Sequence, residues 1–159
     1  MICHGIKLLL KGNHDYWWTT LKKMNEFVDK NNLKNINFLY NNCFYYKNFD
    51  KTGDTDFFVV GTRWWDLKKQ DEESLKILNR EKIRLNISIK SAMDKIKQSY
   101  YKDNIKILCT THYPPITKEM VESEEDNSFI NLLKNYGIED CIYGHLHGKS
   151  HKEGFVRKI

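Results

Sequence analysis

Short apolar runs alternate with longer amphipathic stretches along this chain of 159 residues. Runs with the length of a β-strand lie at residues 6–10, 36–40, 44–49, 57–62, 105–110, 138–143 and 154–159. The pairs Asn41-Asn42 and Gly53-Asp54 mark turns between the second, third and fourth of these runs. The pattern therefore predicts a meander of three strands in the first half of the chain.

Three longer stretches have the spacing of amphipathic helices, and they lie at residues 16–30, 72–98 and 128–136. Gly137 is placed to close the last of them. The longest carries Lys and Glu opposite an apolar stripe of Leu75, Leu78, Leu85, Ile89, Ala92, Met93 and Ile96. The first has Trp17, Leu21, Met24 and Val28 at helical spacing. Strands and helices in a chain of this length predict one α+β domain over residues 1–159.

The composition is that of a soluble globular protein, with 40% hydrophobic and 30% charged residues. The net charge of +5 comes mostly from Lys, which is scattered. A nucleic-acid partner is therefore not expected, although a preference for polyanions is the alternative. Neither an apolar stretch long enough to cross a membrane nor a secretory signal is visible. The four Cys are widely spaced, which favours reduced thiols and a cytoplasmic protein.

Residues that can bind metal follow three of the predicted strands. Asn13-His14-Asp15 follows the first run, His112 follows residues 105–110, and His145 with His147 follows residues 138–143. An extended backbone would turn His145 and His147 to the same side. Each motif has a plainer interpretation: a polar loop with an Asn helix cap, a strand-end histidine held by hydrogen bonds, or a surface turn. The repeated placement at strand ends favours a metal site.

Together these segments resemble the calcineurin-like metallophosphoesterases. The resemblance covers about residues 7–151 and is similar in detail to one bacterial subgroup of phosphohydrolases. Four segments carry it: Lys11-Gly12-Asn13-His14-Asp15-Tyr16-Trp17-Trp18, Gly61-Thr62-Arg63-Trp64-Trp65, His112-Tyr113-Pro114-Pro115 and Tyr143-Gly144-His145-Leu146-His147-Gly148. It implies a four-layer α/β/β/α sandwich and hydrolysis of a phosphoester, in which hydroxide held by two metals attacks phosphorus.

The resemblance also implies a role for individual residues. Asn13, His112 and His145 would bind one metal, and His147 would bind the second. His14 would contact the phosphate and help the leaving group depart, while Asp15 would steady His14. The metals would be Mn, Fe or Zn, which suit such ligands. Arg63 could pair with a phosphate of the substrate, or it could be a plain surface residue.

Two motifs of that family have no counterpart here. No Asp-x-His occurs, and Gly53-Asp54-Thr55-Asp56 is only a partial match to Gly-Asp-x-x-Asp, more readily understood as a turn. The expectation is therefore a sandwich that lacks its first strands, a chain truncated at the N-terminus and probably at the C-terminus, impaired catalysis and room for only one metal. An inactive module that binds a phosphorylated ligand or protein is the alternative. Self-association or a complementing N-terminal fragment would cover the open sheet edge.

Overall fold

The computed structural model describes residues 5–47, 56–98, 105–116, 120 and 128–148. Within these residues the chain forms a two-stranded sheet, a four-stranded sheet and the helices that connect their strands. The α+β class and an incomplete sandwich are thereby confirmed. The extent of the single domain stays a prediction. The expected turn at Gly53-Asp54 and the expected strand at 154–159 lie outside the described residues.

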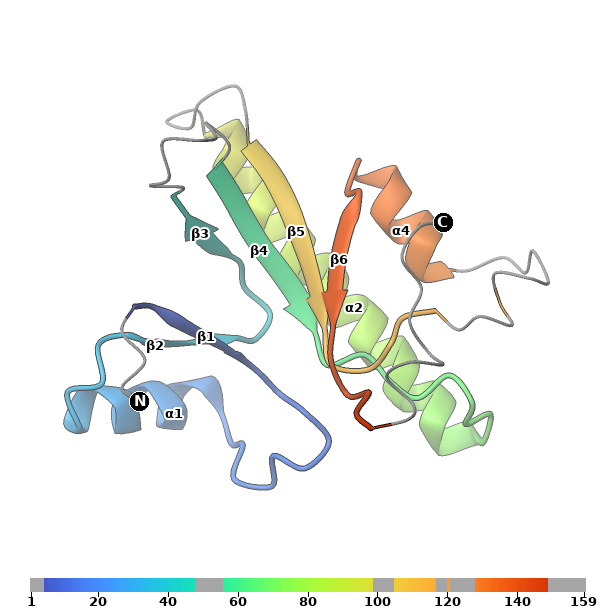
Figure 1. Cartoon of the computed structure of the whole chain (residues 1–159), viewed down its shortest axis with the longest axis horizontal. Coiled ribbons are helices and arrows are strands. Elements are labelled where there is room, and N and C mark those ends of the chain that lie inside the picture. Colours follow the sequence, from blue (N-terminus) through green and yellow to red (C-terminus); the bar gives the residue numbers. More distant parts are fainter. Residues whose placement is uncertain (1–4, 48–55, 99–104, 117–119, 121–127, 149–159) are drawn as a thin grey trace.

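The smaller sheet pairs β1 (Lys7–Leu10) with β2 (Ile36–Leu39) in parallel, and α1 (Leu21–Lys30) connects the two strands. The helix lies along this sheet (Figure 1). Its apolar side buries Met24 and Val28 against Phe38, in a small core of its own. Burial of one helix face against the strands is what holds this unit together.

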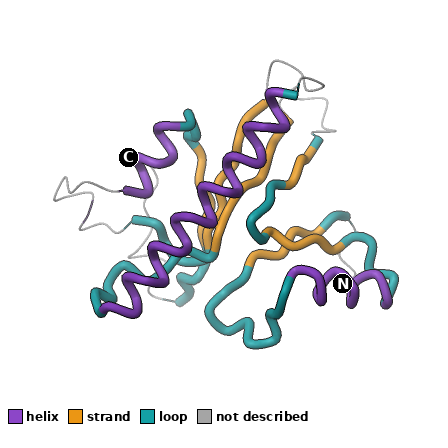
Figure 2. The backbone as a smooth tube through the Cα atoms, turned by 180° about the vertical axis from the view of Figure 1, so that it is seen from behind, coloured by secondary structure: helices purple, strands orange, loops and turns teal. Residues whose placement is uncertain are grey.

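The larger sheet has the order β3-β4-β5-β6, in which β3 is antiparallel to β4 and the other pairs are parallel. Helix α2 runs along one face of it, as Figures 1 and 2 show from opposite sides, and α4 lies beside β6. Long helices that cross between parallel strands are the usual connection in such sheets. The bounds are β3 Phe44–Tyr46, β4 Asp56–Thr62, α2 Glu72–Lys97, β5 Ile105–Thr111, α4 Ser128–Asn135 and β6 Asp140–Tyr143.

The main core lies between α2, α4 and the larger sheet. Phe58 and Val60 alternate on β4 and face Leu85 and Ile89 of the helix, all of them fully buried. Gly61 lets the neighbouring strand come close, because a Cβ atom there would lie 2.1 Å from the carbonyl oxygen of Thr110. The predicted stripe of α2 is right at its centre, but Leu75 is exposed.

The predicted hairpin between residues 36–40 and 44–49 is wrong, because β2 pairs with β1 and β3 pairs with β4. The segment between them carries the chain from one sheet to the other. The side chain of Asn42 accepts from the amide of Tyr40 at 2.8 Å and donates to the carbonyl of Phe38 at 3.0 Å. The hydroxyl of Ser88 on α2 donates to the carbonyl of Asn42. These bonds end the strand and fasten the crossing segment to the long helix.

The starts of one helix and one strand also differ from the prediction. The first helix begins at Leu21 and not at Tyr16, because the side chain of Thr20 accepts from the amide of Lys23 and caps the helix there. The last strand begins at Asp140, since the amide of Ile138 still donates to the end of α4. None of the described helices is long and apolar enough to cross a membrane.

Candidate functional site

The carboxyl ends of the parallel strands β4, β5 and β6 meet at one edge of the larger sheet (Figure 1). Arg63, His112 and Gly144 directly follow these three strands. The loop after β1 reaches the same edge, because Oδ1 of Asn13 lies 2.7 Å from Nε2 of His112. Ligands of α/β sheets bind at such an edge, so we place the candidate site there.

Three side chains that can bind metal converge at this edge: Asn13, His112 and His145. Nε2 of His112 lies 2.7 Å from Oδ1 of Asn13 and 3.2 Å from Nδ1 of His145. A ring nitrogen carries at most one proton, so His112 cannot donate fully to both neighbours. A cation would relieve this conflict, because the amide oxygen and both imidazoles can each offer a lone pair. The donor set therefore fits a metal ion.

Backbone hydrogen bonds hold His112 in place. The amides of His112 and Tyr113 both donate to the carbonyl of Arg63, at 3.2 and 3.0 Å. The ring of Tyr113 lies 4.4 Å from the ring of His145, tilted by 37°. Arg63, which follows β4, thus positions His112 through its carbonyl. Tyr113 in turn supports the ring of His145.

The segment from Gly144 to His147 is bent, and the extended backbone expected across it is wrong. His145 has φ +68°, and the amide of Leu146 donates to the carbonyl of Gly144 at 2.8 Å. The turn directs His145 toward His112, whereas His147 is exposed. Over the described residues, no group of three or more His, Cys, Asp and Glu is placed to hold a metal. The candidate metal ligands that meet at this edge of the larger sheet are the imidazoles of His112 and His145 and the side-chain amide of Asn13.

The loop after β1 is braced by Asp15. One carboxylate oxygen accepts from the amide of Gly12 at 2.6 Å, and the other accepts from the indole of Trp17 at 3.2 Å. A Cβ atom at Gly12 would lie 3.1 Å from Cε1 of His112 and 3.2 Å from the Asp15 carboxylate. A side chain at this position would therefore require the ring or the carboxylate to shift by a few tenths of an ångström.

His14 is exposed and meets the edge of the Tyr16 ring, with 6.3 Å between the ring centroids. We expected Asp15 to steady His14, yet the carboxylate bonds given above go to the loop itself. The ring of His14 is thus open to solvent, in the same loop as Asn13. Asp15 stabilises the conformation of this loop.

Burial shifts the titration of both clustered histidines. The pKa of His112 is lowered by burial and then by the nearby His145, whereas Asp15 acts in the opposite direction. The pKa of His145 is lowered by burial too, with His147 adding to the effect and Asp66 opposing it. Both shifts favour the neutral imidazole, which is the form that binds metal.

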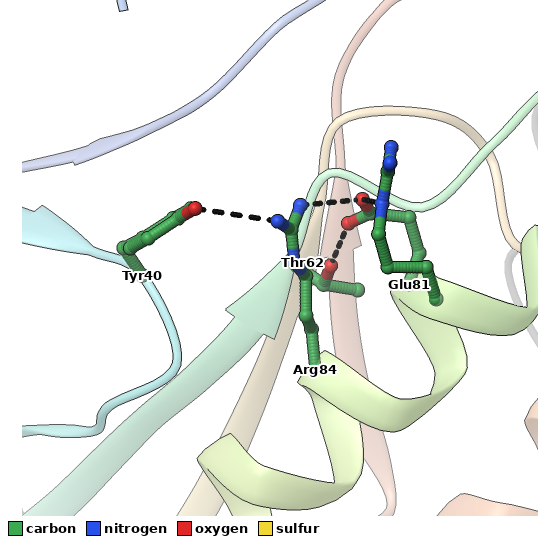
Figure 3. Close-up of polar contacts among 5 residues, drawn as sticks. Tyr40, Thr62, Glu81 and Arg84 are labelled. Carbon is green, nitrogen blue, oxygen red and sulfur yellow. Dashed lines mark hydrogen bonds and ion pairs between the residues drawn. The ribbon is translucent and has the colours of Figure 1, made fainter. Parts of the chain in front are cut away.

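A buried carboxylate, Glu81, accepts a hydrogen bond from Thr62 at the end of β4, and Figure 3 shows it with its polar partners. Glu81 is 1% exposed and accepts another hydrogen bond from Arg84 at 2.8 Å. Arg84 also donates to the hydroxyl of Tyr40 at 3.2 Å. Arg80 stands 3.6 Å from the same carboxylate. This network connects α2 to Thr62, the last residue of β4, and to Tyr40, which follows β2.

Sequence reasoning missed Glu81 and its partners. Its position was the available signal, since Glu81 falls on the apolar side of α2 between Leu78 and Leu85. The sequence did point to Arg63, whose guanidinium lies 4.6 Å over the ring of Trp65. Nε of Arg63 is buried and has no hydrogen-bond partner among the described residues.

The family model described as calcineurin-like phosphoesterase matches residues 1–149. No curated protein and no solved structure matches the chain. The match spans every residue placed in the site above, whereas neither the bacterial subgroup nor a truncation is supported by it.

Proposed function

The chain belongs to the calcineurin-like phosphoesterase family, and on that premise we propose that it is a metal-dependent hydrolase of phosphoesters. The observation that carries the proposal is the approach of Asn13 and His145, each from its own strand end, to within hydrogen-bonding distance of Nε2 of His112. Amide oxygen and neutral imidazole are ligands for Mn, Fe and Zn, and the choice among these metals is open.

In this proposal Asn13, His112 and His145 hold one metal, and His147 contributes to a second. A divalent metal, when bound, polarises the phosphoryl oxygens and makes a water molecule more acidic. Asn13 adds no charge to the site, which leaves the metal a stronger electrophile than a carboxylate would.

The exposed ring of His14 is free to meet a substrate. It would donate a hydrogen bond to a phosphoryl oxygen and pass a proton to the departing oxygen. Asp15 would keep His14 within reach through its bonds to Gly12 and Trp17. Arg63 would pair with an anionic part of the substrate, as its planar fork suits phosphate.

An inactive module that binds a phosphorylated ligand is the second candidate. It is favoured because, over the described residues, no group of three or more His, Cys, Asp and Glu is placed to hold a metal. In this form the protein would retain one metal or none. Impaired turnover, relative to an enzyme with two complete metal sites, is the intermediate case.

The partner in either case is a phosphorylated molecule. Within the described residues β1 is the end strand of its sheet. We therefore keep self-association, or pairing with a complementing strand from an N-terminal fragment, as a proposal. Size-exclusion chromatography with light scattering tests the first, with a dimer as the expected result and a concentration-independent monomer as the contrary one.

Hydrolysis of p-nitrophenyl phosphate tests the function. We expect turnover after loading with Mn²⁺, no turnover in EDTA, and none in a His112→Gln variant that retains the unfolding midpoint of the parent. Lys97→Gln on the exposed end of α2 is the matched control and should retain the parent rate. Metal bound without turnover would support the inactive module, and turnover that survives EDTA would contradict both candidates.

A further inference from the structure

Two cations at the candidate site have no carboxylate partner among the described residues. Lys11 comes directly after β1, and Arg63 comes directly after β4. Both therefore stand at the sheet edge that brings Asn13 and His112 together. The described ion pairs involve neither of the two side chains.

The nearby carboxylates are already engaged. Glu81 accepts from Thr62 with one oxygen, while its other oxygen faces Arg84 at 2.8 Å and Arg80 at 3.6 Å. Asp15 accepts from the backbone of its own loop and from an indole. Neither Lys11 nor Arg63 therefore takes part in an ion pair among the described residues.

Both cations stand next to the same histidine. The carbonyl of Arg63 accepts from the amide of His112 at 3.2 Å, and Lys11 lies two positions before Asn13, whose Oδ1 is 2.7 Å from Nε2 of His112. Two partly buried cations at one edge, neither of them in a described ion pair, are unfavourable unless an anion binds there.

The side chain of Arg63 is held in an orientation that could bind such an anion. Its guanidinium is stacked at 4.6 Å on the ring of Trp65, which fixes the plane of the fork. Trp65 in turn packs on Tyr113, with 5.5 Å between the ring centroids, next to His112. Nε of Arg63 is buried without a hydrogen-bond partner in the described part of the chain, so the protein does not satisfy every donor of this guanidinium.

We infer that Lys11 and Arg63 form a second anion subsite beside Asn13, His112 and His145, and that the substrate carries a second phosphate next to the one that is cleaved. A phosphoanhydride or a closely spaced bisphosphate has this shape. The choice of a second phosphate rests on the proposed function, because that function places the first phosphate at the histidine cluster. A guanidinium fork and an ammonium together match the charge and the oxygen geometry of a phosphate.

Binding of inorganic pyrophosphate to the full chain in EDTA, followed by isothermal titration calorimetry, tests the subsite without metal or turnover. We expect pyrophosphate to bind more tightly than orthophosphate at the same ionic strength. Lys11→Gln and Arg63→Gln should each weaken pyrophosphate binding by about tenfold, as expected for one lost charge-assisted hydrogen bond. Lys11→Arg should largely restore it, since the charge is kept.

The matched control is Lys97→Gln, which removes the same charge from an exposed helix position far along the chain. Equal weakening by this control would show that binding follows overall charge, and it would overturn the subsite. Equal affinity for pyrophosphate and orthophosphate would overturn it as well. Urea unfolding of each variant shows whether it is folded. If Arg63→Gln does not fold, the pyrophosphate affinity of Lys11→Gln alone tests the subsite.

A second measurement separates this inference from the proposed function. With Mn²⁺ present, Lys11→Gln should raise KM for adenosine diphosphate and leave KM for p-nitrophenyl phosphate unchanged. If the parent protein hydrolyses neither compound, the proposed function fails, while the calorimetry still decides the subsite. If both KM values rise together, Lys11 contacts the cleaved phosphate and the second subsite is wrong.

Discussion

Oδ1 of Asn13 lies 2.7 Å from Nε2 of His112, although 99 positions separate the two residues in the chain. One residue belongs to the loop after β1 and the other to the end of β5, so the contact joins the smaller sheet to the larger one. The candidate metal site is therefore also a place where the two sheets are held together. A change on either side of the contact should affect metal binding.

Gly12→Ala should weaken metal binding without removing a ligand. The new Cβ atom would lie 3.1 Å from Cε1 of His112, tighter than ordinary packing, so the ring or the loop must move. We expect Mn²⁺ affinity to fall by about tenfold or more, which is typical when support of a ligand is lost. Gly144→Ala is the control, because its Cβ atom would meet the nearest atom, the His112 carbonyl oxygen, only at 3.7 Å. Equal affinity of the two variants in calorimetry would contradict the role of Gly12.

The two proposed metals should be separable by mutation. His112→Ala should empty the site formed with Asn13 and His145, because it removes the central donor atom. His147→Ala should remove only residual binding of a second metal and leave the first site occupied. Metal per folded chain, measured by elemental analysis after equilibration with Mn²⁺ and dialysis, distinguishes them. Equal loss in both variants, or no loss in either, would refute this assignment.

Glu81→Gln should destabilise the protein more than any loss of an exposed ion pair. The carboxylate is 1% exposed, and its removal would leave Arg84 beside a neutral side chain. Breaking a buried pair from one side costs about 3–5 kcal/mol, and the lower end applies because Arg84 is partly exposed. Urea denaturation measures this difference in the free energy of unfolding.

The control for Glu81 is Glu72→Gln on the same helix. Glu72 pairs with Lys76 at 2.6 Å, and both side chains are exposed. Such pairs contribute about 0.3–0.5 kcal/mol. If the two substitutions shift the urea midpoint by similar amounts, the buried network does not contribute as argued.

Asp71 should give the stability a defined dependence on pH. The amide of Ser74 donates to its carboxylate at 2.9 Å and lowers the pKa of the group below 3.8. Because the folded pKa is depressed, the contribution is complete above the unfolded value and is lost as pH falls through the folded value. Asp71→Asn should remove this part of the acid sensitivity. Parallel curves of unfolding free energy against pH for the parent and the variant would contradict the assignment.

Several elements were predictable because their signals are local. The long helix follows from the spacing of Leu85, Ile89 and Ala92, and it has nearly the predicted bounds. The strand that ends before His112 extends only one residue further than predicted. Patterns of this kind reflect which face of a single element is buried, so they can be recognised without knowledge of its neighbours.

Strand pairing was not predictable in the same way. Asn41-Asn42 has the composition of a hairpin turn, and Asn41 does adopt φ +58°. The strand before it nevertheless pairs with β1, which lies on the other side of a helix in the sequence. Burial of Met24 and Val28 on that sheet outweighs the local preference for a hairpin.

By itself the sequence determined the element types, the positions of Asn13, His112 and His145 at strand ends, and the family. The tertiary structure decided which of these side chains meet: Asn13, His112 and His145 converge, while a left-handed turn at His145 leaves His147 exposed. It also decided that Glu81 is buried and that Lys11 and Arg63 share one edge. The reason is that hydrophobic periodicity records burial along one element, whereas contacts between charges depend on how separate elements are packed.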